Sequence, residues 1–88
     1  MTKIRSTTQY DKSAKKFLKR HPELCARYLK TLQLLEMNPG HPSLRLHKLQ
    51  GLELYSVSIN LSYRITLEFY VSDDFIVLVN IGSHDEAY

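Results

Sequence analysis

The chain of 88 residues has little of three things: it contains one cysteine, three glycines and no long hydrophobic run. A lone cysteine cannot form an internal disulfide, so the fold does not require an oxidising compartment. The glycines are not gathered into a loop that could hold phosphate groups. No stretch approaches the roughly 18 apolar residues of a membrane-spanning helix, and residues 1–10 do not resemble a signal sequence. We therefore expect a cytoplasmic protein that does not bind membranes.

Metal and cofactor motifs are also missing from the sequence. The four histidines are spread along the chain and have no cysteines at the spacing of a zinc site. No nucleophile elbow or similar hydrolase motif appears. The sequence therefore predicts neither a metal nor a cofactor. Cys25 falls among apolar residues, which favours a buried and inert thiol over a reactive one.

Charge is divided unevenly along the chain. Apolar residues make up 43% of the sequence, enough for one core, and we expect residues 1–88 to form one domain. Residues 1–50 contain 11 Lys and Arg against 3 Asp and Glu, whereas residues 51–88 contain 1 against 6. This division predicts either a polarised surface that meets phosphate groups on one side, or simply lysine-rich exposed helix faces.

Hydrophobic periodicity predicts two helices in the first half of the chain, after a short strand over residues 3–8. Apolar residues recur at helical spacing up to the break at Pro22, and a second stripe continues to the breakers at residues 38–40. The two helices should form an antiparallel hairpin. The apolar positions are Tyr10, Ala14, Phe17 and Leu18, then Leu24, Tyr28, Leu32, Leu34 and Leu35, with Thr31 as a polar interruption.

The second half changes to a period of two, which predicts strands over residues 55–59 and 63–71 with a turn between them. Residues 75–81 are almost continuously apolar, which is typical of a central strand covered on both faces. Residues 44–49 are predicted to form a further short strand or a loop. The element order predicts an α+β fold, β-α-α-β-β-β, with the helical hairpin packed on one face of a twisted, mainly antiparallel sheet.

The opposite face of this sheet is predicted to be polar. Arg64 is the only Lys or Arg after Lys48, and a guanidinium on such a face can hold a phosphate through two hydrogen bonds. The alternative is a cross-strand ion pair with Glu68 or Glu53. The residues that alternate with the apolar set are Ser56, Ser58, Arg64, Thr66 and Glu68.

Three further residues have side chains suited to acid–base chemistry. His84 follows the last predicted strand, and an imidazole can titrate near neutral pH. Together with Tyr88, His47 and Arg64, it supplies what RNA cleavage by the neighbouring 2′-hydroxyl requires. That reaction needs a base, an acid and a cation for the charge on the phosphorane, but no metal. Taken singly, these residues are more typical of a surface histidine, a frayed terminus and a basic loop.

Four segments resemble the RelE/ParE superfamily of toxins from type II toxin–antitoxin systems: Leu46–Gly51, Tyr55–Asn60, Tyr63–Ile65 and Ile81–Tyr88. The last is similar to the G-S/T-H-x-E-x-Y/F ending common among RelE- and YafQ-like members. Length and element order agree over essentially the whole chain. The resemblance implies the RelE fold and a cognate antitoxin protein as partner, with operator DNA bound only through the antitoxin. For many members it also implies cleavage of mRNA in the ribosomal A site, beside 16S rRNA.

The resemblance also implies roles for single residues. Arg64 matches the strand arginine that contacts the scissile phosphate. His84 matches a C-terminal histidine proposed as acid or base, and Tyr88 matches a terminal aromatic that stacks on a base or assists proton transfer. His47 resembles the histidine before the Leu-x-Gly turn of the YafQ-like branch. The predicted RNA-binding residues are Arg45, His47, Lys48 and Ser58.

The strand over residues 55–59 departs from the family pattern. Ser58 stands where the YafQ-like branch has a histidine and YoeB an arginine, and RelE's lysines have no counterpart. The leading hypothesis is a ribosome-dependent mRNA endonuclease, an mRNA interferase. Two others stay open: a non-enzymatic inhibitor of DNA gyrase like the ParE branch, and a weakened or inactive toxin that binds its antitoxin and operator.

Overall fold

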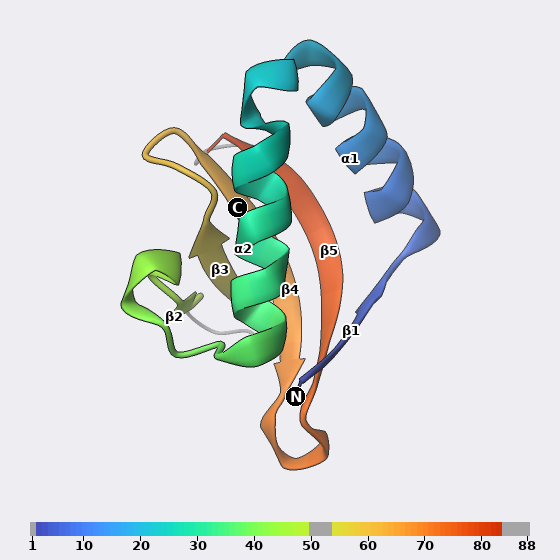
Figure 1. Ribbon diagram of the computed structural model, residues 1–88. Helices are drawn as coiled ribbons and strands as arrows, with labels where there is room; N and C mark the ends of the chain where they lie inside the picture. The colour runs from blue at the N-terminus through green and yellow to red at the C-terminus, as the bar shows by residue number, and fades with distance from the viewer. Residues whose placement is uncertain (1, 50–53, 84–88) are drawn as a thin grey trace.

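The computed structural model describes residues 2–49 and 54–83, in which two helices cover one face of a five-stranded sheet (Figure 1). The strand order is β1-β5-β4-β3-β2, and β1 with β5 is its one parallel pair. The predicted α+β fold with a mainly antiparallel sheet is therefore confirmed. No helix in the described ranges is long and apolar enough to cross a membrane. The elements are β1 (Lys3–Ser6), α1 (Thr8–Arg20), α2 (Cys25–Met37), β2 (His47–Lys48), β3 (Leu54–Ser58), β4 (Tyr63–Tyr70) and β5 (Phe75–Ser83).

Local sequence signals set the ends of the helices. The side-chain oxygen of Thr7 accepts a hydrogen bond from the backbone N–H of Tyr10, which caps α1 and ends the first strand two residues earlier than predicted. Pro22 begins a 3₁₀ turn between the helices, and α2 ends at Met37 with Asn38 as its C-cap, as the breakers predicted. A second 3₁₀ turn, Pro42–Leu44, leads into β2, so the further short strand predicted near residues 44–49 is present.

The hydrophobic core lies between the helices and the sheet, as α2 lying across the strands in Figure 1 indicates. The apolar positions predicted for both helices supply one side, and odd-numbered residues of β3 and β4 supply the other. In β5 the side chains of Ile76, Leu78 and Ile81 are buried, whereas Val77 on the other face is only half-buried. The face of this strand away from the helices is therefore only partly covered, less than predicted.

The side chain of Cys25 is exposed, contrary to the expectation of a buried thiol. It is the first residue of α2 and lies on the outward face with Leu29, four residues on, whose side chain is 54% exposed. The buried stripe of α2 runs instead through Tyr28, Thr31 and Leu35. The hydroxyl of Thr31 donates to the backbone carbonyl of Arg27 at 2.9 Å, so the polar interruption of the stripe is satisfied within the helix.

Two tyrosines join the helices inside the core. The hydroxyl oxygens of Tyr10 and Tyr28 lie 2.8 Å apart and share a hydrogen bond. Burial, and then this hydrogen bond, raises the pKa of Tyr10 far above its ordinary value of 10.0, and burial also raises the pKa of Tyr28. Both phenols therefore stay protonated in the folded protein at a pH where exposed tyrosines ionise.

Alkaline solution is expected to destabilise the fold through this pair. Below about pH 10 both phenols are protonated in the folded and unfolded states, whereas above it only the unfolded chain releases their protons. The free energy of unfolding should therefore fall as pH rises, by up to about 1.4 kcal/mol per pH unit for each phenol. Tyr10→Phe should cost about 1 kcal/mol near neutral pH and make the decline shallower. Denaturant titrations on both sides of pH 10 measure this, and equal declines in both proteins would refute it.

Candidate functional site

A row of polar side chains crosses the sheet on the side away from the helices, which we call the polar face. Directly paired residues of antiparallel strands point to the same side. The register places His47 of β2 opposite Ser56 of β3, Ser56 opposite Thr66 of β4, and Thr66 opposite Asn80 of β5. His47 therefore shares a face with the strand residues that sequence alternation predicted to be polar.

Arg64 lies in the next row of the polar face, between Ser58 of β3 and Gly82 of β5. Its side chain is half-buried, and Nη1 donates a hydrogen bond to Oγ of Ser56 at 3.2 Å. A guanidinium has five N–H donors in a rigid plane, so this bond can orient the group while other donors bind a ligand. The arrangement suits a phosphate that approaches the polar face.

The predicted alternative for Arg64, an ion pair with Glu68, does not form between these two described residues. The carboxylate of Glu68 instead accepts a hydrogen bond from the hydroxyl of Tyr70, which raises the pKa of that phenol. The other predicted partner, Glu53, lies outside the described residues. The structure thus leaves Arg64 with a neutral hydroxyl as its hydrogen-bond partner rather than Glu68.

Two residues predicted to lie on an open polar face are buried. The side chains of Ser56 and Thr66 are 0% and 3% exposed. Alternation assigns a residue to a face but says nothing about how far neighbouring side chains cover it. The accessible part of the predicted site is therefore formed by His47, which is exposed, and by Ser58 and Arg64, which are half-buried.

The remaining predicted residues lie elsewhere or outside the described ranges. Lys48 is paired with Tyr55, so its side chain is directed to the opposite side of the sheet from that of His47. Arg45 has a left-handed backbone with φ 49° immediately after the turn Pro42–Leu44. His84 and Tyr88 lie outside the described residues.

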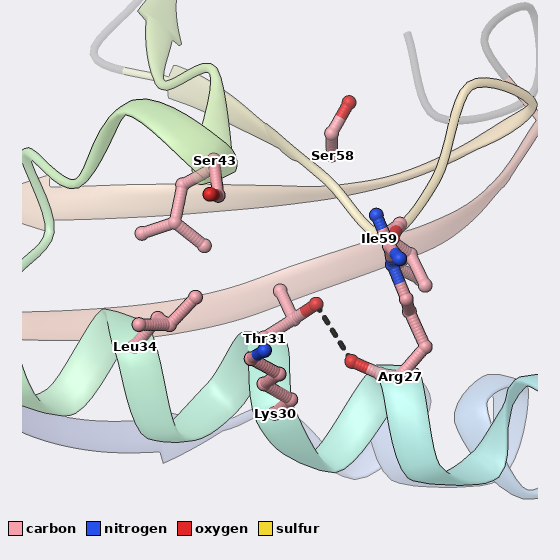
Figure 2. A pocket seen from close by; sticks show the side chains of 8 residues that line it. Arg27, Lys30, Thr31, Leu34, Ser43, Ser58 and Ile59 are labelled. Carbon is pink, nitrogen blue, oxygen red and sulfur yellow. Dashed lines mark hydrogen bonds between the residues drawn. The ribbon is translucent and has the colours of Figure 1, made fainter.

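A hollow of about 190 Å³ opens between α2, the turn Pro42–Leu44 and the end of β3 (Figure 2). Arg27 and Lys30 of α2 line it, and Nε of Arg27 donates to the backbone carbonyl of Ile59 at 2.9 Å. A second hollow of about 380 Å³ shares Arg27 and Ser58 with the first and adds Arg45. Neither Arg27 nor Lys30 was among the predicted residues, although their i, i+3 spacing places them on one face of a helix.

No metal site is formed by the part of the chain that the structure describes. Within residues 2–49 and 54–83, no three His, Cys, Asp or Glu side chains come together in a way that could hold a metal ion.

No known protein family and no curated protein matches the chain by sequence. Solved structures match it in fold. A chain of the archaeal RelE–RelB complex from Pyrococcus horikoshii OT3 has a TM-score of 0.73 and 20% identity over 93% of each chain. The E. coli DinJ–YafQ complex contains a chain with a TM-score of 0.71 and 21% identity, covering 97% of this chain and 96% of that one. A YoeB/ParE toxin from Agrobacterium tumefaciens has a TM-score of 0.75 and 14% identity, and the match covers 94% of this chain and 99% of that one.

These matches establish the architecture. The chain has the fold of the RelE, YafQ and YoeB/ParE toxins, over nearly its whole length. The RelE-like fold that the sequence resemblance implied is therefore confirmed.

Proposed function

We propose that the chain is the toxin of a type II toxin–antitoxin system and acts as an mRNA endonuclease on the ribosome. The observation that carries the proposal is the position of Arg64. It is half-buried on the polar face, oriented by Ser56, and lies in register with Gly82, two residues before His84. An arginine held in this way can stabilise charge that develops on a phosphate, and the proposal assigns proton transfer to a histidine.

The proposed reaction divides three roles among these residues. The 2′-hydroxyl of the RNA loses its proton to a general base and attacks the neighbouring phosphorus. The bond to the 5′-oxygen breaks as a general acid protonates that oxygen, which leaves a 2′,3′-cyclic phosphate and a 5′-hydroxyl. Arg64 stabilises the phosphorane. His84 and Tyr88 are the candidates for the two proton transfers, and His47 borders the same face.

A cognate antitoxin protein is the proposed partner. Two of the similar structures are complexes, RelE–RelB and DinJ–YafQ. On this chain, Leu29 and Met37 leave apolar surface on the outward side of α2, with exposed fractions of 54% and 71%. We propose that the pair works in the cytoplasm, with mRNA in the ribosomal A site beside 16S rRNA as substrate. Operator DNA would be bound only through the antitoxin.

A second candidate function is an inactive toxin that serves as a binding module. The observation that favours it is β3, in which Ser56 is buried and neither serine carries a charge. Each missing cation should lower the affinity of the protein for the RNA backbone.

Expression of the chain without its antitoxin is expected to arrest growth and to create new mRNA 5′ ends. In His84→Ala, cleavage should fall about 10²-fold or more, because proton transfer by a positioned side chain contributes about that much. Mapping of 5′ ends after induction measures this, with the amount of soluble protein as control. DNA breaks with intact mRNA would point to gyrase inhibition instead. Normal growth with abundant folded protein would favour the binding module.

A further inference from the structure

We infer that the hollow between α2 and the end of β3, together with the adjoining hollow that Arg45 lines, is a second phosphate-binding subsite, which holds the backbone of single-stranded RNA beside Arg64. The inference deepens the proposed function and rests on it for the identity of the ligand. It concerns Arg27 and Lys30, which the sequence did not single out, and the predicted residues Arg45 and Ser58.

Positive charge converges on this hollow and on the one that adjoins it, and no acidic residue that the structure describes lines them. Arg27 and Lys30 line this hollow from α2, and Arg45 lines the adjoining hollow from the turn before β2. Within residues 2–49 and 54–83, no Asp or Glu lines either of the two adjoining hollows. Glu23, one turn before Arg27, has its carboxylate 3.6 Å from Nδ1 of His21 instead. The local field therefore favours an anion.

Arg27 is held in place before any ligand binds. Its Nε donates to the carbonyl of Ile59, and Figure 2 shows the guanidinium beside Ile59 with Lys30 on the next turn of α2. A guanidinium whose plane is already set loses little further freedom when it binds phosphate oxygens. The side chain of Ser43, on the opposite wall of the hollow, adds a hydroxyl. These groups suit a phosphodiester better than an apolar ligand.

Ser58 connects this hollow to the polar face. It lines both hollows and is directly paired with Arg64 on β4. Neighbouring strands are about 4.8 Å apart, and in Figure 2 the hydroxyl of Ser58 is directed away from α2. An RNA backbone can thus pass from Arg64 over Ser58 to Arg27 and Arg45. The cations that β3 lacks are supplied beyond its end by the helix and the turn.

Salt dependence of RNA binding tests this subsite. A short single-stranded RNA is bound to Arg64→Ala protein, which the proposal makes unable to cleave it, and affinity is measured by fluorescence anisotropy from about 50 to about 200 mM salt. Lys30→Gln and Arg45→Asn each remove one cation, and Asn tolerates the left-handed backbone at position 45. Each should reduce the slope of log affinity against log salt by about 0.7. The loss of affinity over this range should then become about 2.5-fold smaller.

The control variant is Lys3→Gln, which removes an exposed lysine from β1, at the opposite edge of the sheet. Its slope should equal that of the parent. A single-stranded DNA of the same sequence should show the same changes as the RNA, because the subsite contacts phosphates. A change with RNA alone would overturn the phosphate assignment.

The outcomes separate this inference from the proposed function. If Lys30→Gln and Arg45→Asn keep the slope of the Lys3→Gln control, the subsite is wrong, even where the unsubstituted chain cleaves RNA. If both variants lower the slope but the unsubstituted chain never cleaves RNA, the subsite stands and the endonuclease proposal falls.

Discussion

Arg64→Ala is expected to slow RNA cleavage about 10²–10³-fold, the usual effect of removing one preorganised donor that stabilises charge in a transition state. The guanidinium is half-buried and oriented by Ser56, so it needs little rearrangement to meet the phosphorane. Arg64→Lys should recover only part of the rate, because an ammonium restores the charge but not the planar pair of donors. Single-turnover cleavage of mRNA on ribosomes gives the rates.

Arg5→Ala is the matched control for this measurement. Arg5 also projects from the sheet, where its guanidinium lies 5.8 Å from the ring of Phe75, and it lies on β1 rather than beside the site. Its loss should leave the cleavage rate unchanged. Thermal unfolding of each variant separates lost chemistry from lost folding. If Arg64→Ala is folded and cleaves as fast as Arg5→Ala, Arg64 is not the phosphate-binding residue.

Leu35→Ala is expected to lower the free energy of unfolding by about 2–5 kcal/mol, since it removes a buried side chain and leaves a cavity. Leu35 is 0% exposed and packs in the core that α2 forms with the sheet. Small domains have only about 5–15 kcal/mol of stability in total, so this variant should lose a large share of it. Urea denaturation gives the difference directly.

Leu29→Ala makes the same chemical change on the same helix, at a side chain that is 54% exposed. It should alter stability by only about 0.5 kcal/mol. Equal losses in the two variants would show that α2 does not pack on the sheet through Leu35. Growth arrest by the two variants can also be compared. Leu35→Ala should be less toxic than Leu29→Ala, because less of it is folded.

The element types could be predicted because burial imposes a period on the sequence. Apolar residues recur every 3.6 residues or so in α1 and α2, and about every second residue in β3 and β4. The predictions failed where a position depends on neighbours far along the chain. Cys25 is exposed because the hairpin packs through another face of α2, and Ser56 is buried although its strand alternates as predicted.

The candidate site also contains residues that local sequence could place and residues that it could not. Alternation was enough to place Arg64 on the polar face, because successive side chains of a strand point to opposite faces and the apolar set of β4 marks the face toward the core. It could not separate His47 from Lys48, since both lie in a two-residue strand whose register with β3 decides their faces. Nor did it identify Ser56 as the hydrogen-bond partner of Arg64, since cross-strand distances decide that contact.

The sequence by itself therefore determined the helices, the strands, the apolar faces that form the core, and an arginine on the side of the sheet away from the helices. The tertiary structure alone decided that β1 runs parallel to β5, and that Arg27 and Lys30 of α2 meet Arg45 and Ser58 at the end of β3. The physical reason is the separation along the chain of the residues whose interactions decide each feature. Periodicity reports how each segment divides its own side chains between core and water, whereas pairing register and helix packing are set by contacts between segments far apart in the chain.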